Sequence, residues 1–126
     1  MTDPIKVEGP KPLRIIICGG RDYEDYNALR RYMDKFHWNT PVGEVIQGGA
    51  RGADTIASAW ALTRGIPCTE VVADWESHGK AAGVIRNRAM ADLRPDAVVA
   101  FPGGKGTAMM VNLARRRGVR VYEVCP

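Results

Sequence analysis

The sequence predicts an α/β protein in which five mostly parallel strands form one doubly wound sheet, with helices on both faces. Strand-like apolar runs alternate with helix-like segments from residue 13 to the end of the chain. The strand-like runs are nearly continuous in Val and Ile, which is typical of strands buried on both faces of a parallel sheet. Paired glycines follow three of these runs.

The elements follow in order after residues 1–12, which are rich in proline and charge and are expected to form a flexible N-terminal tail. The first apolar run stops at a glycine pair, and the next segment has apolar residues at helical spacing. The alanine-rich segment that follows ends at Gly65, a favourable C-terminal cap. A polar stretch, residues 74–79, leads into the third helix. The expected strands are residues 13–18, 44–47, 66–73, 96–101 and 119–124, and the expected helices are residues 23–38, 53–64, 80–93 and 108–117. Residues 13–126 are expected to form a single, Rossmann-like domain.

Composition narrows the class of protein further. The chain has 126 residues, 45% hydrophobic and 25% charged, which suits one folded domain and argues against disorder. A net charge of +4 suits an anionic ligand or nucleic acid, and equally ordinary solubility. The cysteines Cys18, Cys68 and Cys125 lack zinc or redox spacing and are expected to be buried, inert thiols. A reducing, cytoplasmic location without membrane contact is expected, because we find no signal peptide and no apolar run of about 20 residues.

Three strand ends carry the glycine pairs Gly19-Gly20, Gly48-Gly49 and Gly103-Gly104. The carboxyl ends of parallel strands share one edge of a sheet, so these loops should lie together. Glycine lets backbone amides approach a phosphate closely, and the helix after each loop adds free N–H donors and partial positive charge. The alternative is that each pair only makes a tight turn.

The segment Pro102-Gly103-Gly104-Lys105-Gly106-Thr107 is the most specific of these loops. Thr107 is expected to cap the next helix and to donate its hydroxyl to a phosphate oxygen. Lys105 either adds a charge or is merely exposed. The segment lacks the Gly-Lys-Ser/Thr ending of a Walker loop, and no segment shows the dinucleotide GxGxxG pattern.

Charged residues adjoin the other two glycine pairs. Arg21 stands directly after the first pair, and Arg51 follows the second, where a bidentate phosphate contact or simple exposure is expected. Asp54 is either a ligand contact or a carboxylate that stabilises the first turn of its helix.

The loop after the third strand brings Asp74, Trp75 and Glu76 to the same edge. An aromatic ring beside carboxylates suits a nucleoside, in which the base stacks and the ribose donates hydrogen bonds. Trp75 could instead pack as a lid on the neighbouring helix. Arg86 and Asn87 lie in that helix, where the arginine suits either a phosphate or the protein surface.

These motifs together resemble the SLOG superfamily, and within it the YspA-like (cpYpsA-related) group. The matching residues are Ile17 to Tyr23, Gly48 to Asp54, Ala73 to Trp75 with Gly79 to Gly83, Arg86-Asn87, and Phe101 to Thr107. The resemblance implies a Rossmann-like fold that binds a nucleotide or a nucleotide-derived small molecule, such as ADP-ribose, NAD or a nucleoside phosphate. It implies a role as a sensor or sequestering module in bacteria or phages. It also implies a homodimer or higher homo-oligomer.

One departure from the superfamily bears on catalysis. In the related phosphoribohydrolases, which belong with proteins mislabelled lysine decarboxylases, paired glutamates closely follow the Gly-Thr. Here Met109 and Met110 stand nearby, and a thioether cannot activate water or stabilise an oxocarbenium ion. Binding without turnover is therefore the leading hypothesis, with no cofactor and no metal required. A nucleotide hydrolase using Asp74 or Glu76 is the alternative. Nucleic-acid binding, as in the superfamily's DNA-processing member, is less favoured because no series of stacking aromatics is present.

Overall fold

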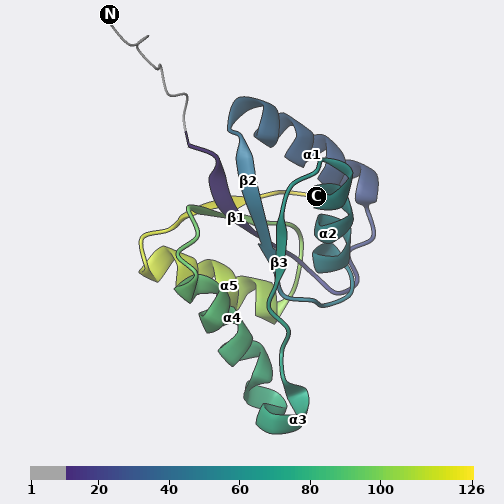
Figure 1. Ribbon diagram of the computed structural model, residues 1–126. Helices are drawn as coiled ribbons and strands as arrows, with labels where there is room; N and C mark the ends of the chain where they lie inside the picture. The colour runs from purple at the N-terminus through teal and green to yellow at the C-terminus, as the bar shows by residue number, and fades with distance from the viewer. Residues whose placement is uncertain (1–10) are drawn as a thin grey trace, which may run out of the picture.

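The computed structural model describes residues 11–126, in which a single five-stranded sheet has every pair of neighbouring strands parallel (Figure 1). The strands are β1 (Leu13–Cys18), β2 (Val42–Gln47), β3 (Cys68–Glu70), β4 (Ala97–Ala100) and β5 (Arg120–Glu123). Their spatial order is β3-β2-β1-β4-β5. The chain therefore builds outward from β1 to β3 and then returns to β1 to start the second half with β4. This is the doubly wound, Rossmann-like arrangement that the sequence predicts.

Helices cover both faces of the sheet, as expected. The helices α1 (Tyr26–Asn39) and α2 (Ala53–Thr63) lie on one face, and α4 (Ala82–Asp92) and α5 (Lys105–Arg116) lie on the other (Figure 1). The short α3 (Trp75–His78) projects beyond the carboxyl end of the sheet and continues through a 3₁₀ turn, η1 (Gly79–Ala81), into α4.

The central strand β1 shows why its sequence is continuously apolar. Ile15 and Ile17 are fully buried in the core beneath α1 and α2, whereas Ile16 and Cys18 belong to the core beneath α4 and α5. Successive side chains of a strand point to opposite faces, so a strand buried on both faces has no polar positions.

Several element boundaries differ from the expected ones. The strand expected at residues 66–73 is reduced to the three residues of β3, which pair in register with β2 at the edge of the sheet. The first helix begins at Tyr26, since the carboxylate of Asp25 accepts a hydrogen bond from the amide of Ala28 and caps it there. The polar stretch after β3 is not all loop, because it contains α3.

The prediction for the cysteines is correct only for Cys18. Its side chain is buried in the sheet, and burial, together with the nearby charge of Asp54, raises the pKa of this thiol to about 12. Cys68 and Cys125 are exposed, contrary to expectation. Cys68 lies on the edge strand β3, and Cys125 follows the opposite edge strand β5, so neither is covered on both sides.

The expected tail, residues 1–12, falls mostly outside the described residues. Within them, Pro12 lies so close to Gly43 that a Cβ at position 43 would be 2.7 Å from the Cβ of Pro12. Among residues 11–126, no helix has the length and apolar character needed to cross a bilayer.

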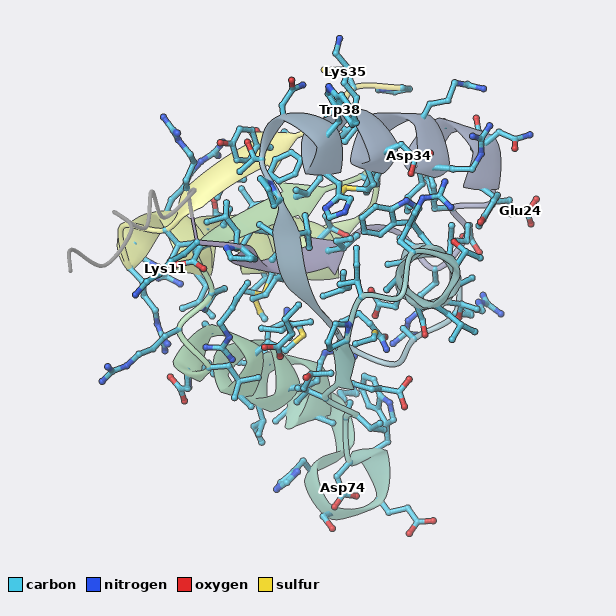
Figure 2. The ribbon with its side chains drawn as sticks, turned by 45° about the horizontal axis from the view of Figure 1, so that its top comes forward. Lys11, Glu24, Asp34, Lys35, Trp38 and Asp74 are labelled. Atoms are coloured by element: carbon cyan, nitrogen blue, oxygen red, sulfur yellow. The ribbon has the colours of Figure 1, made fainter. Side chains whose placement is uncertain are left out.

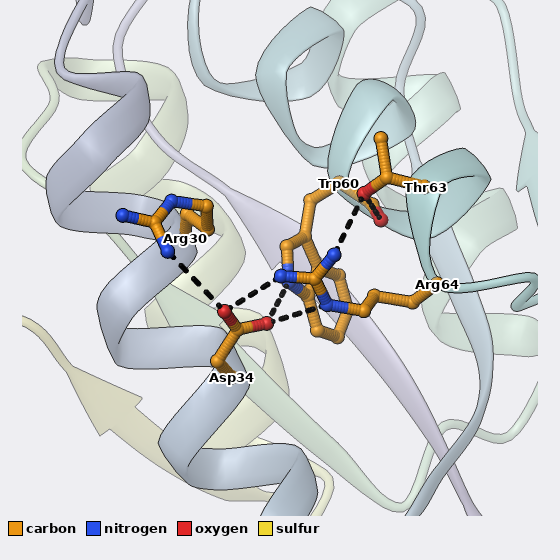
Figure 3. A network of polar contacts seen from close by, with 5 residues as sticks. All are labelled: Arg30, Asp34, Trp60, Thr63 and Arg64. Carbon is orange, nitrogen blue, oxygen red and sulfur yellow. Dashed lines mark hydrogen bonds and ion pairs between the residues drawn. The ribbon is translucent and has the colours of Figure 1, made fainter.

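A polar network joins α1 to α2 (Figure 3). The carboxylate of Asp34 accepts hydrogen bonds from Nε1 of the buried Trp60 (2.9 Å) and from Nε and Nη2 of Arg64 (2.8 and 2.7 Å). Arg30 adds an ion pair at 3.7 Å, and the hydroxyl of Thr63 bonds to the carbonyl of Trp60. The network therefore fixes α2, whose N-terminus contributes to the site described below.

The pH dependence of stability should reveal this network. The hydrogen bonds from Arg64, aided by Trp60, lower the pKa of Asp34 to about 2. A carboxyl group whose pKa is lowered by folding stabilises the protein at every pH above the pKa it has in the unfolded chain. This stabilisation is lost as the pH falls through the pKa of the folded state. We expect Asp34→Asn to cost about 1–2 kcal/mol of unfolding free energy near pH 7, since the pair is partly exposed to solvent. The difference in unfolding free energy between Asp34→Asn and the wild type should shrink to almost nothing between about pH 4 and pH 2.

Urea denaturation at several pH values measures this difference. Asp92→Asn is the matched control, because Asp92 pairs with Arg117 between α4 and α5 but is mostly exposed. We expect almost no change in the control. Equal losses of unfolding free energy in both variants would contradict the stabilising role of the Asp34 network. A loss for Asp34→Asn that stays constant down to pH 2 would contradict the low pKa of Asp34.

Candidate functional site

One pocket lies where the strand order reverses, between the carboxyl ends of β1 and β4. The two strands end level with each other, with Cys18 paired to Ala100. The loops that follow are tied by a hydrogen bond from the amide of Gly20 to the carbonyl of Pro102, at 2.9 Å. The pocket has a volume of about 610 Å³ and is open to one side. Open α/β sheets place their ligands at this kind of position.

The helix α5 begins inside this pocket. Lys105, Gly106 and Thr107 all line it, and no side chain caps the helix at its N-cap residue, Gly104. The first amides of a helix have no intrahelical acceptor, so these N–H groups and the positive end of the helix dipole face the cavity. The arrangement favours an anion.

The expected cap at Thr107 is wrong. The helix begins at Lys105 rather than Ala108, which places Thr107 within its first turn. Its hydroxyl lies against Gly103, where a Cβ would collide with Thr107 Oγ1. Thr107 remains a lining residue of the pocket.

The glycines of the site have two different roles. A Cβ at Gly19 would lie 2.6 Å from the Cβ of Ala53, and one at Gly103 would lie 2.6 Å from the amide nitrogen of Gly20. These glycines let the loops pack against each other. A Cβ at Gly104 or Gly106 would meet no atom within 4 Å. These two positions border open space, where a ligand can approach the backbone.

Arg86 and Asn87 connect the loops from the α4 side. Nη1 of Arg86 donates to the carbonyl of Gly48 (2.8 Å), and its Nε donates to Oδ1 of Asn87 (3.1 Å). The buried Asn87 donates in turn to the carbonyl of Gly106 (3.3 Å). The guanidinium is half-buried and held in place, so it offers a fixed positive charge to the pocket.

Asp54 is a buried carboxylate in the wall of the pocket. It lies in the first turn of α2, and its Oδ2 accepts a hydrogen bond from the amide of Ala50 at 3.2 Å. Burial raises its pKa, although the hydrogen bond and the charge of Arg86 oppose the rise. Asp54 therefore occupies the first turn of α2, as expected of a helix-stabilising carboxylate, and it also lines the cavity, while its contact with a ligand stays a prediction.

A second pocket, of about 620 Å³, adjoins the first. It contains the remaining glycine pair, Gly48 and Gly49, together with Arg51 and Trp75. Nη2 of Arg51 lies 3.4 Å from Asp22, although both side chains are largely exposed. The predicted residues are thus divided between two neighbouring pockets.

Asp74 and Glu76 stand apart from both pockets. Asp74 caps α3 by accepting a hydrogen bond from the amide of Ser77. Hydrogen bonding by the Ser77 side chain, and secondly by its amide, lowers the pKa of this exposed carboxyl group. Neither residue belongs to the lining of the two pockets described. Figure 2 shows Asp74 at the projecting tip of the molecule.

Apolar residues of the pocket were not predicted from the sequence as part of the site. Cys18, Met90 and Met110 line its floor, and Met110 is fully buried. Met110 follows Thr107 by three residues and therefore lies on the same face of α5, a spacing that could have identified it.

The sheet order and the pocket at its switch point define an α/β protein of Rossmann-like fold. A solved structure of phosphoribosylglycinamide formyltransferase from Coxiella burnetii, in complex with CHES, has a similar fold, with a TM-score of 0.55 and 15% sequence identity. The similarity covers 92% of this chain and 52% of the formyltransferase, so this chain spans about half the length of that protein. At this identity the likeness concerns the fold alone.

The chain belongs to the YAcAr family, described as the YspA, cpYpsA-related SLOG family, whose sequence pattern matches residues 13–78. It is also 39% identical over 119 residues to the Gene 61 protein of Mycobacterium phage D29. That alignment covers 87% of this chain and 94% of the phage protein. The resemblance noted from the sequence motifs is therefore confirmed.

Proposed function

We propose that this protein binds a nucleotide or a nucleotide-derived phosphate compound, as a sensor or sequestering module. One observation carries the proposal: the uncapped N-terminus of α5 opens into a pocket that also receives the fixed guanidinium of Arg86. Backbone amides at a helix start and an arginine together form a favourable environment for phosphate. Membership of a SLOG family supports a nucleotide-related ligand.

The remaining lining residues suit the rest of such a ligand. Arg21 adds a second positive charge at the mouth of the pocket, and the buried carboxylate of Asp54 can accept a hydrogen bond from a ribose hydroxyl. Met110 supplies a thioether one turn after Thr107 rather than a carboxylate. This composition favours binding over hydrolysis.

Isothermal titration calorimetry with AMP, ADP-ribose and NAD tests the proposal, with adenosine as a ligand that lacks phosphate. We expect at least one phosphate compound to bind, and adenosine to bind at least about tenfold more weakly than AMP, since it lacks the charge-assisted hydrogen bonds. Arg86→Ala should lower the affinity for the phosphate compounds by about ten- to one-hundredfold.

Arg88→Ala is the matched control, because Arg88 lies on the same helix but is exposed and lines neither pocket. It should leave affinity unchanged. Equal binding of adenosine and AMP, or the absence of any effect of Arg86→Ala, would refute a phosphate site at this place.

A further inference from the structure

The two neighbouring pockets share a wall. Arg21, Ala50 and Arg86 line both of them, and the two volumes are nearly equal, at about 610 and 620 Å³. Each volume alone falls within the range of about 300–1,000 Å³ that is typical of small-molecule sites. A ligand confined to the first pocket would leave a second cavity of the same size empty beside it.

The second pocket has its own chemistry. Its charged lining residues are all cationic, namely Arg21, Arg51 and Arg86. Val72 and Trp75 provide an apolar wall, and both side chains are unusually exposed for their size, at 65% and 49%. Positive charge next to an exposed aromatic ring suits a negatively charged group joined to a flat or sugar ring.

Trp75 is held in a position to receive such a ring. One edge of its indole rests near α4, where a Cβ at Gly83 would lie 3.6 Å from Cη2. The guanidinium carbon of Arg21 lies 5.5 Å from the centre of the indole ring, within the range of a cation–π contact. Arg21 thus contacts Trp75 while also lining the pocket at α5, which makes it a physical link between the two cavities.

We infer that the ligand has two ends and fills both pockets. One phosphate lies on the amides of α5, the connecting phosphate passes between Arg21 and Arg86, and a second ring or sugar lies against Trp75. The chemical class is a nucleoside diphosphate extended by a further sugar or nucleoside, rather than a mononucleotide. This inference rests on the proposed function, because it places the first end of the ligand at the same phosphate site.

Calorimetry with AMP and with ADP-ribose distinguishes the two ligand sizes. We expect ADP-ribose to bind at least about tenfold more tightly than AMP. Trp75→Ala should abolish most of that advantage and leave the affinity for AMP unchanged. Trp38→Ala is the control, since Trp38 is 87% exposed on α1, far from the tip that carries Asp74 (Figure 2), and it should change neither affinity.

If AMP and ADP-ribose bind with equal affinity and Trp75→Ala changes neither affinity, the proposal of a two-ended ligand is wrong, while the phosphate site at α5 still stands. A loss of AMP binding in Trp75→Ala would also overturn it, because the single base would then occupy the second pocket. Failure of both compounds to bind the wild-type protein would remove the proposed function and this inference together. Thermal melting of each variant verifies that it is folded.

Discussion

Replacing Gly106 with aspartate is expected to abolish phosphate binding without harming the fold. A Cβ at this position meets no atom within 4 Å, so the new side chain has room. It adds a negative charge to the first turn of α5, where an anionic ligand is expected and where acidic residues stabilise a helix. Affinity for a phosphate compound should fall by about one-hundredfold or more, as two charge-assisted hydrogen bonds are lost to repulsion.

Gly106→Ala is the matched control for this variant. It makes the same backbone change without the charge and should bind within a few-fold of the wild type. Thermal melting should show Gly106→Asp to be at least as stable as the wild type. Undiminished binding in Gly106→Asp would mean that the anion site is elsewhere.

Replacing Gly52 with alanine is expected to cause the largest loss of stability among single-methyl changes at these loops. Gly52 has a φ of +80°, and a Cβ there would collide with the carbonyl oxygen of Gly20 and lie 2.5 Å from that of Arg21. Both neighbours are backbone atoms, so they cannot rotate aside. We expect a loss of about 2–4 kcal/mol in unfolding free energy.

Gly65→Ala separates the strain of the backbone from the collision. Gly65 follows the other end of α2 with a φ of +66°, and a Cβ there would meet no atom within 4 Å. This variant should lose only about 1 kcal/mol, the cost of the positive φ alone. Equal losses in urea denaturation of the two variants would show that the contact between the first two loops is not tight.

Much of the fold could be predicted from the sequence because its signals are local. The continuous apolar run of β1 and the glycine pairs at strand ends report burial and chain reversal within a few residues. The order of the strands is not local, so the sequence predicted one shared edge for the glycine loops but not that the loops after β1 and β4 are direct neighbours there. The pairing of Asp34 with Trp60 and Arg64 was missed for the same reason, since the bonded residues are 26 and 30 positions apart in the sequence.

The candidate site likewise combines features that are local in the sequence with features that depend on the three-dimensional packing. The glycines that line the pocket at α5 were predicted, because a cluster such as Gly103-Gly104-Lys105-Gly106 is visible in the sequence itself. The hydrogen bond from Arg86 to the carbonyl of Gly48 spans 38 residues and depends on how α4 packs. The separation of the predicted residues into two pockets likewise required the three-dimensional arrangement.

The backbone amides at the start of α5 can be observed directly by NMR. In a titration of the ¹⁵N-labelled protein with AMP, the amide signals of Lys105, Gly106 and Thr107 should move most, because their N–H groups would donate to the phosphate. If the amide signals of these three residues do not move while other signals shift at saturation, the anion does not lie at the N-terminus of α5.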